Sequence, residues 1–258
     1  YLEEKFKVYV HFSEDCISEE SIKTSSTMLK KEIHLLENLR YYNEETSNNV
    51  EFAKKLSKHA DIYINDAFGL SHRQHSSNSA ILNFFNEKAI GLLMQREINN
   101  LSGEITNKST IIIGGTKIST KIKLINKYLG YASHILIGGA MAFTFLKAQG
   151  KNIGMSNYEE NMINIAHDIL KKSITKGTII VLPNDFVCSK SEKNIDFDIF
   201  RIEDIKDNFI GYDIGPETTM NFSMIIRNSN KVIWNGPMGM FENPEYATGT
   251  QAICYEIK

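Results

Sequence analysis

The chain has 258 residues, of which 42% are hydrophobic and 23% are charged, a composition typical of a globular protein with a buried core. Its 29 basic and 31 acidic side chains give a formal net charge of −2, without the basic excess that nucleic-acid binding requires. The most apolar stretch, residues 135–146, is far shorter than the about 20 residues that span a bilayer. We therefore expect neither a nucleic-acid nor a membrane partner.

Three cysteines, Cys16, Cys188 and Cys254, lie far apart and form no C-x-x-C pair. Their odd number and spacing favour a reducing compartment over a disulfide framework or a zinc site, so we expect a cytoplasmic protein. We interpret the three side chains as small, partly buried hydrophobes. No targeting peptide is visible, but residue 1 is tyrosine, and we expect the chain to begin partway through a longer one.

Short apolar runs alternate with segments of helical period along the chain. The predicted strands are residues 8–12, 33–36, 61–65, 110–113, 134–137, 178–182 and 231–234. The predicted helices are residues 19–29, 50–59, 90–101, 117–129, 140–149, 158–172 and 216–227. Because most of the apolar runs are dense rather than alternating, they predict strands that are covered on both faces. The order predicts an α/β fold with parallel sheets between helices.

The composition changes near the middle of the chain, where a helix-period segment is followed by a polar, glycine-containing stretch. We expect a first α/β unit at 1–89, a connecting helix and loop at 90–107, and a second α/β unit at 108–258. A single sheet with an ordinary crossover helix is the alternative that the pattern leaves open.

Three predicted strands of the second unit end in small residues. The first runs into Gly114 and Gly115, the second into Gly138 and Gly139, and the third into the sequence NGP at 235–237. In an open parallel sheet, ligands bind at the carboxyl ends of the strands, and glycine lets a ring or a phosphate approach the backbone. Neither G-x-G-x-x-G nor G-x-x-x-x-G-K-[ST] occurs, which counts against a dehydrogenase and an ordinary P-loop enzyme.

Lys117 and Lys121 are four residues apart at the start of the predicted helix 117–129, so we expect both on one side near its N-terminus. Cations there oppose the helix dipole, an unfavourable placement that a bound anion would explain. The alternative is a pair of solvated surface lysines.

A second basic cluster lies in the first unit. Arg40 follows one predicted strand, and His72, Arg73 and His75 follow another. The planar guanidinium group of arginine is well suited to phosphate and carboxylate oxygens, so these residues favour a small anionic metabolite. The alternatives are structural histidines and an arginine that is only a surface charge.

These segments together resemble the phosphoglycerate kinase family. The similar motifs, in family order, are LLENLR at 35–40, NDAFG at 65–69 with HR at 72–73, GLLMQREI at 91–98, IIIGGTKISTKI at 111–122, IGGAMAFTFLKAQG at 137–150, LPND at 182–185, GYDIGPET at 211–218 and WNGPMGMFE at 234–242. The resemblance extends along the whole chain. It implies two Rossmann-like parallel-sheet domains that face each other across a cleft and are joined by an interdomain helix.

The resemblance also implies reversible phosphoryl transfer in glycolysis between 1,3-bisphosphoglycerate and ADP, giving 3-phosphoglycerate and ATP, by a monomer that uses Mg²⁺ with the nucleotide. The implied catalytic residues are Lys117, Lys121 and Arg73. The implied triose-binding residues are Arg40, Arg73 and His72. The implied nucleotide-binding residues are Gly115, Thr116, Lys121, Gly138, Gly139, Gly211, Asn235, Pro237 and Glu242. No metal ligand is expected within the chain.

The chain departs from the family pattern in several places. The R-x-D-x-N-x-P segment and the G-G-G-D loop, whose aspartate helps to hold magnesium, are not found. Thr116 replaces an alanine, Thr120 an aspartate, Ala140 a glycine and Leu70 a small polar residue. We therefore expect an active full-length kinase but little catalysis by these 258 residues alone. A divergent nucleotide-binding relative with weak or no turnover is the first alternative, and a dinucleotide-binding oxidoreductase, disfavoured by the missing G-x-G-x-x-G, is the second.

Overall fold

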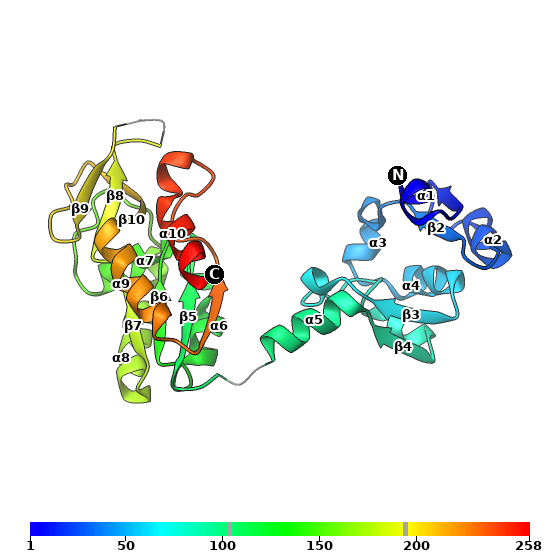
Figure 1. Cartoon of the computed structure of the whole chain (residues 1–258), viewed down its shortest axis with the longest axis horizontal. Helices are drawn as coiled ribbons and strands as arrows, with labels where there is room; N and C mark the ends of the chain where they lie inside the picture. The colour runs from blue at the N-terminus through cyan, green and yellow to red at the C-terminus, as the bar shows by residue number, and fades with distance from the viewer. Residues whose placement is uncertain (103–104, 193–195) are drawn as a thin grey trace. The chain divides into compact units, whose positions relative to one another are not determined.

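The computed structural model describes residues 1–102, 105–192 and 196–258 (Figure 1). The chain forms two compact units, Tyr1–Gly103 and Glu104–Lys258. The described strands form four separate sheets, two within each unit, so the alternative of a single sheet is wrong. The finer division at 1–89, 90–107 and 108–258 stays a prediction.

The first unit contains two pairs of parallel strands and short helices. Its strands are β1 (Val10–Ser13) paired with β2 (Ile33–Leu36), and β3 (Ile62–Asn65) paired with β4 (Glu87–Ile90). Its helices are α1 (Leu2–Phe6), α2 (Glu19–Thr27), α3 (Asn43–Thr46), α4 (Val50–Leu56) and α5 (Leu92–Leu101). Side-chain caps fix two helix starts, because Ser18 accepts the N–H of Ser21 and Asn49 accepts that of Phe52.

The core of the first unit lies on one side of these strands. Phe52, Leu56, Ile81 and Phe85 form its centre and bring α4 against the strands. Residues that point to the opposite side stay exposed, as for Ile64, of which 61% is accessible. The strands predicted to be covered on both faces are therefore covered on one face in this unit.

The second unit is built around a four-stranded parallel sheet in the order β11-β5-β6-β7. These strands are β5 (Ser109–Ile113), β6 (His134–Ile137), β7 (Ile179–Val181) and β11 (Lys231–Asn235). The helices of this unit are α6 (Ile122–Tyr128), α7 (Met141–Ala148), α8 (Ile163–Lys176), α9 (Pro216–Arg227) and α10 (Thr248–Ile257). The predicted α/β class with parallel strands is confirmed.

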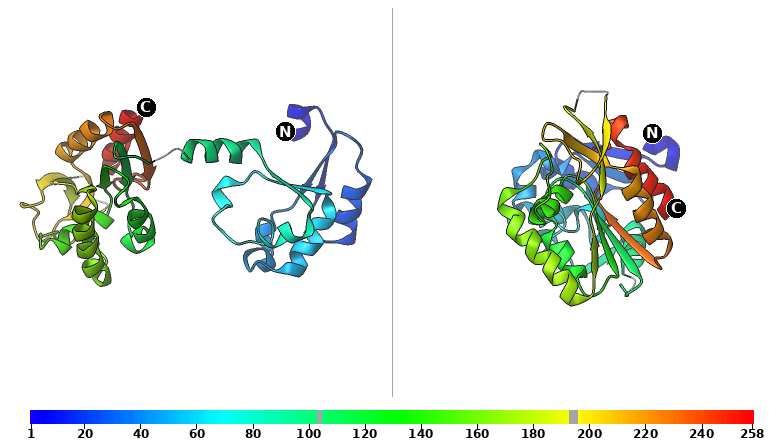
Figure 2. Two further views of the ribbon diagram at one scale, coloured as in Figure 1. Left: turned by 90° about the horizontal axis from the view of Figure 1, so that it is seen from below. Right: turned by 90° about the vertical axis from the view of Figure 1, so that its left-hand side faces the viewer.

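Alternate residues of the central strands point to opposite faces of this sheet, and both faces are covered. Ile111 and Ile113 of β5 pack in a cluster with α6, α7 and α8, whereas Ile112 packs in a second cluster with α9 and α10. Figure 2 shows α9 and α10, in orange and red, on one side of the sheet and the green helices on the other. This two-sided burial explains the dense apolar runs of β5 and β6.

A smaller antiparallel sheet in the second unit was not predicted. It has the order β10-β8-β9 and consists of β8 (Asp185–Ser189), β9 (Asp198–Arg201) and β10 (Ile210–Ile214). These strands contain glycine, aspartate and arginine in place of a continuous apolar run, and aspartate and glycine are infrequent in strands. Strand β10 also shifts register between Gly211 and Asp213.

The predicted helix 117–129 is wrong at its start. Lys117 is extended, residues Ile118–Thr120 form a 3-10 turn, and α6 begins only at Ile122. The hydroxyl of Thr120 donates to the carbonyl oxygen of Lys117 at 2.9 Å, a local bond that competes with helical pairing. The expectation that Lys117 and Lys121 share one side of a helix N-terminus is therefore wrong as well.

Other predicted boundaries shift by a few residues. The helix predicted at 90–101 begins at Leu92, because the residues before it form β4. The helix predicted at 158–172 is α8, Ile163–Lys176. Of the cysteines, Cys16 and Cys188 are buried but Cys254 is exposed. Burial raises the pKa of the Cys188 thiol to about 12, so this thiol stays protonated.

Candidate functional site

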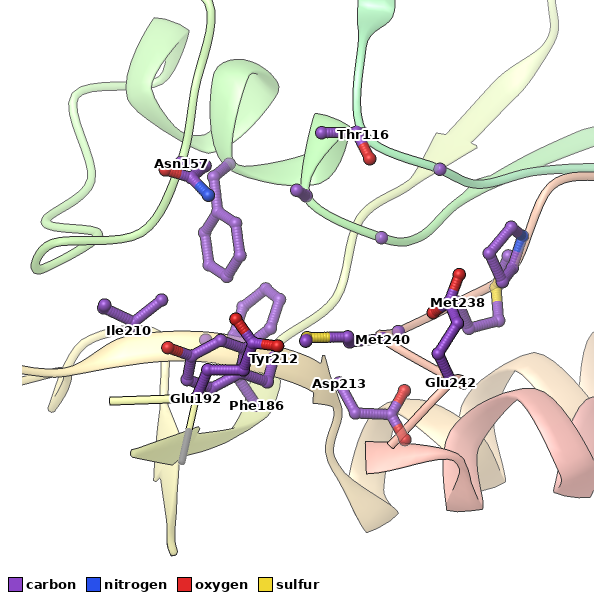
Figure 3. A pocket seen from close by; sticks show the side chains of 17 residues that line it. Thr116, Asn157, Phe186, Glu192, Ile210, Tyr212, Asp213, Met238, Met240 and Glu242 are labelled. Carbon is purple, nitrogen blue, oxygen red and sulfur yellow. The ribbon is translucent and has the colours of Figure 1, made fainter. Parts of the chain in front are cut away.

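A cavity of about 560 Å³ opens in the second unit, lined in part by residues that follow β5, β6 and β11 (Figure 3). Loops at the carboxyl ends of parallel strands are the usual ligand site of such a sheet. The predicted nucleotide-binding residues that line it are Gly115, Thr116, Gly139, Gly211, Pro237 and Glu242. Three others, Gly138, Lys121 and Asn235, are not among its lining residues.

Glycine is required at two positions of the cavity wall by close contacts. A Cβ on Gly139, whose φ is +68°, would lie 2.5 Å from the carbonyl oxygen of Gly115. A Cβ on Gly211 would lie 2.3 Å from Cζ of Phe143. The absence of a side chain at both positions therefore lets neighbouring segments of the cavity wall pack closely together.

The buried side of the cavity is aromatic. The rings of Phe143 and Phe186 have centroids 4.5 Å apart, and Tyr212 stacks on Tyr246 at 4.7 Å. Figure 3 shows Phe186 and Tyr212 on the side of the cavity opposite Thr116 and Asn157. Aromatic rings of this kind provide an apolar surface on which a planar ring can stack.

The segment WNGPMG at 234–239 forms a rim that backbone hydrogen bonds hold in place. The carbonyl oxygen of Pro237 accepts the N–H of Gly115 at 2.9 Å, and that of Met238 accepts the N–H of Gly139 at 2.7 Å. The indole N–H of Trp234 donates to the carbonyl oxygen of Gly236 at 2.6 Å. The rim is thus bonded to both of the other glycine-rich strand ends.

A buried carboxylate, Asp213, lies in the cavity wall on β10. Its Oδ2 accepts the N–H of Gly249 at 2.7 Å and its Oδ1 accepts the N–H of Ile214 at 2.9 Å. Burial raises the pKa of Asp213 to about 7 despite these hydrogen bonds. Its protonation state therefore changes near neutral pH.

The lining of the cavity carries acidic groups but no lysine or arginine among the described residues. Asp213, Glu192 and Glu242 are its ionisable carboxyl groups. Such a lining suits the uncharged or hydroxyl-bearing part of a ligand better than a phosphate.

The two predicted lysines lie outside this lining. The Nζ of Lys121 donates a hydrogen bond to Oδ1 of Asn235, which ties the start of α6 to the end of β11. Lys117 is exposed and interacts electrostatically with Glu159. Thr116 lines the cavity, and Lys117 is the next residue along the chain.

Glu159 was not predicted, and it holds the turn that follows Lys117. Its carboxylate accepts the N–H of Ser119 at 3.0 Å and the hydroxyl of Ser119 at 2.6 Å. Its own N–H donates to Oγ1 of Thr144, which is buried in α7. Partial burial acts to raise the pKa of Glu159, but the bonds from Ser119 and the charge of Lys117 lower it overall. Glu159 thus bonds the turn at 118–120 to the body of the unit.

In the first unit, the predicted anion-binding residues form two contacts. Arg40 Nη1 lies 3.3 Å from Nε2 of His75, which is buried, and Arg73 Nε lies 3.4 Å from Nε2 of His72, which is exposed. Because His75 is only two residues from Arg73, Arg40 lies beside the segment that carries Arg73. The guanidinium groups of both arginines are exposed side chains that an anion can reach.

Most of the residues that line the cavity were not predicted from the sequence. They are Phe143, Asn157, Phe186, Glu192, Ile210, Tyr212, Asp213, Met238, Gly239 and Met240. Phe143, Tyr212, Asp213 and the methionines lie inside the quoted motifs and could have been found there. Asn157, Phe186 and Glu192 come from segments with no such signal.

No helix in the described ranges is long and apolar enough to cross a membrane. Within residues 1–102, 105–192 and 196–258, no three His, Cys, Asp or Glu side chains cluster in a way that suits a metal ion.

Comparison with known proteins identifies relatives of the whole chain. The family model described as phosphoglycerate kinase matches residues 1–258. The chain is 37% identical over 249 residues to a phosphoglycerate kinase from Prochlorococcus marinus, covering 95% of this chain and 62% of that protein. It is 39% identical over 260 residues to the cytosolic phosphoglycerate kinase 3 of Arabidopsis thaliana, covering 99% of this chain and 65% of that protein.

A solved structure is similar as well. The phosphoglycerate kinase from Pyrococcus horikoshii OT3 matches with a TM-score of 0.84 at 27% identity, covering 99% of this chain and 67% of that one. The chain thus spans somewhat less than two thirds of the length of its curated relatives. With a family match along its full length, the chain belongs to the phosphoglycerate kinase family.

Proposed function

We propose that the protein catalyses reversible phosphoryl transfer between 1,3-bisphosphoglycerate and ADP, giving 3-phosphoglycerate and ATP in glycolysis. The observation that carries the proposal is the glycine-lined cavity at the carboxyl ends of the parallel strands, with Lys117 next to its wall. Membership of the phosphoglycerate kinase family supports it. In the reaction, the bond between phosphorus and the acyl oxygen breaks, a bond to the β-phosphate oxygen of ADP forms, and a carboxylate leaves.

The nucleotide occupies the cavity in this proposal. Its adenine ring lies against the part of the wall that contains Gly139 and Gly211. Glu242 accepts hydrogen bonds from the ribose hydroxyls. The remaining proposed nucleotide contacts are Gly115, Thr116, Gly138, Lys121, Asn235 and Pro237. The apolar and acidic lining supports the nucleoside end of the ligand in the cavity and the phosphates toward the lysines.

The triose substrate binds to the first unit in this proposal. Arg40 and Arg73 donate hydrogen bonds to its phosphate and carboxylate oxygens, and His72 also contacts it. The exposure of both guanidinium groups supports this role. A phosphate or carboxylate accepts two parallel hydrogen bonds from one arginine, which orients the ligand as well as binding it.

Lys117, Lys121 and Arg73 stabilise the transferred phosphoryl group. Phosphoryl transfer depends mainly on positioning and on neutralising charge spread over the phosphate oxygens, which cationic side chains supply. Mg²⁺ enters with ATP or ADP as part of the substrate, since magnesium is commonly held by phosphates and water with few protein ligands. The convergence of Lys117 and Arg73 on one phosphate remains a prediction.

A coupled assay of the full-length protein tests the proposal. We expect ATP formation that depends on 1,3-bisphosphoglycerate and that falls by orders of magnitude in a Lys117→Ala variant. Absence of this activity in the folded wild-type protein would refute the proposed function. Turnover no better than that of the variant, together with ADP binding, would identify a nucleotide-binding relative without catalysis.

We also propose a cytoplasmic monomer that acts on small molecules only. A relative named as cytosolic supports the location. Light scattering of the purified protein measures the oligomeric state, and a dimer at micromolar concentration would contradict the proposal.

A further inference from the structure

Three side chains of the first unit form a row from the core to the surface. Glu45 of α3 is 2% exposed, His75 is 8% exposed, and Arg40 lies at the surface. Oε1 of Glu45 lies 3.9 Å from Nδ1 of His75, and Nε2 of the same ring lies 3.3 Å from Nη1 of Arg40. The imidazole ring therefore stands between a buried carboxylate and an exposed guanidinium group.

The contact with Arg40 assigns the tautomer of the imidazole. Arginine has donors and no acceptor, so Arg40 must donate and Nε2 of His75 must accept. An accepting Nε2 carries no hydrogen, so in this contact the hydrogen of the ring is on Nδ1. That N–H faces the carboxylate of Glu45.

Hydrogen bonds to Ser76 and Ser77 hold Glu45 at a fixed position. Its carboxylate accepts the N–H of Ser77 at 2.9 Å and the hydroxyl of Ser77 at 2.6 Å. Its carbonyl oxygen accepts the N–H of Ser76 at 2.9 Å. The carboxylate thus keeps a fixed position in the core, with Oε1 3.9 Å from Nδ1 of the imidazole.

Folding alone does not explain a histidine at this position. Nδ1 of His75 is buried and has no hydrogen-bond partner, since Glu45 is too distant for one. A buried donor without a partner lowers stability, and an apolar side chain would avoid that loss. The hydrogen bond that the imidazole of His75 does form is to an exposed arginine, whose orientation folding does not need.

We propose that His75 is a positioning residue that holds the guanidinium group of Arg40 ready for an anionic ligand. The inference rests on the proposed binding of the triose by Arg40. It assigns His75 a different role from that of His72, which is exposed and contacts Arg73. The ligand is one whose phosphate or carboxylate accepts from a prearranged guanidinium group, and prearrangement raises affinity because less side-chain freedom is lost on binding.

The test compares His75→Leu, which removes the acceptor, with His75→Gln, which keeps an acceptor oxygen near the position of Nε2. Calorimetry on the full-length protein measures the affinity for 3-phosphoglycerate and for MgADP. We expect His75→Leu to weaken 3-phosphoglycerate binding about tenfold, His75→Gln to restore most of it, and both to leave MgADP affinity within about twofold. His167→Leu and His167→Gln, at an exposed position on α8, are the controls for the loss of a histidine side chain.

A double variant separates positioning from general destabilisation. Because His75 acts through Arg40, Arg40→Ala with His75→Leu should bind 3-phosphoglycerate no more weakly than Arg40→Ala alone. Losses that multiply would overturn the inference, as would wild-type affinity in folded His75→Leu. Thermal unfolding of each variant identifies any that fails to fold. If His75→Leu does not fold, the 3-phosphoglycerate affinity of His75→Gln, with and without Arg40→Ala, decides the question.

A second readout does not depend on the proposed function. The side-chain NMR signal of Arg40, assigned with Arg40→Lys, should show slower guanidinium rotation in the wild type than in His75→Leu. Equal rotation would overturn the inference whatever the protein binds. If the wild type fails to bind 3-phosphoglycerate but His75→Leu frees Arg40, the proposed substrate is wrong and the positioning by His75 stands.

Discussion

The carboxylate of Asp213 on β10 accepts the backbone N–H of Gly249 at the start of α10, with 2.7 Å between Oδ2 and the nitrogen. The same carboxylate allows no side chain beside it, because a Cβ on Gly239 would lie 2.2 Å from Oδ1. Asp213 therefore joins the cavity rim, the antiparallel sheet and the last helix. Because it is buried and titratable, it makes the stability of the second unit depend on pH.

The stability contribution of Asp213 is lost as pH rises. Burial raises its pKa from the ordinary value of 3.8 to about 7, so the folded state binds a proton that the unfolded state has already released between these values. The free energy of unfolding should fall across this window, by at most about 1.4 kcal/mol per pH unit. Asp213→Asn, which stays neutral, should become more stable relative to wild type between pH 5 and pH 8.

Urea unfolding of both proteins at several pH values measures this difference. Asp168→Asn, at an exposed position on α8, is the matched control and should show no such trend. An unchanging difference between Asp213→Asn and wild type would show that Asp213 does not titrate in this range.

The start of α9 depends on a second buried carboxylate. The carboxylate of Asp185 accepts two hydrogen bonds from Thr218, from its N–H at 2.7 Å and from its hydroxyl at 2.6 Å. It also accepts the N–H of Glu217 at 2.9 Å. Asp185→Ala leaves these donors without partners near a helix N-terminus and should lower the free energy of unfolding by about 3 kcal/mol. Denaturant unfolding measures this loss of stability, and Asp204→Ala, at an exposed position, is the control. Equal stability of the two variants would contradict this role.

A methyl group at Gly211 should block the cavity. The added Cβ would lie 2.3 Å from Cζ of Phe143, which packs against Phe186 and has little room to move. We expect Gly211→Ala to weaken MgADP binding about tenfold or more, equivalent to about 1.4 kcal/mol. Calorimetry measures the affinity, and Gly69→Ala, with no atom within 4 Å of the new Cβ, is the control. Unchanged affinity in folded Gly211→Ala would place the nucleotide elsewhere.

Loss of the Glu159 carboxylate should reduce turnover more than nucleotide affinity. Glu159→Gln weakens the bonds to Ser119 and removes the charge near Lys117, so the turn after Lys117 becomes less fixed. We expect kcat of the full-length protein to fall about tenfold with MgADP affinity within about twofold, because positioning of the transferred group is lost while the cavity is intact. Steady-state kinetics and calorimetry measure the two effects, and Glu160→Gln is the exposed control. Equal kcat in Glu159→Gln and Glu160→Gln would refute this role of Glu159.

The predicted sheet of the second unit was correct because both faces of its strands are buried. Ile111, Ile112 and Ile113 are fully buried, so a dense apolar run is sufficient to identify such a strand. The strands β8, β9 and β10 gave no comparable signal. They pair antiparallel through Gly211, Asp213 and neighbouring polar residues, and their pairing depends on contacts between distant segments.

The start of α6 shows how tertiary contacts override a local pattern. Helical period alone extends the helix back to Lys117, but Ile118–Thr120 form a 3-10 turn, and Ser119 in this turn donates to the carboxylate of Glu159, 40 residues away. The sequence contains both residues and gives no sign that they meet. The positions of the two lysines were therefore predicted from the wrong geometry.

From sequence alone, the parallel strands of the second unit, their glycine-rich ends and the identity of the cationic residues could be determined, because each depends on neighbours within a few positions. The tertiary structure decided which of these residues line the cavity, that Lys121 pairs with Asn235, and that His75 rather than His72 contacts Arg40. Those relationships join residues up to 114 positions apart. Burial and hydrogen bonding at such separations are properties of the packed chain, and no local pattern encodes them.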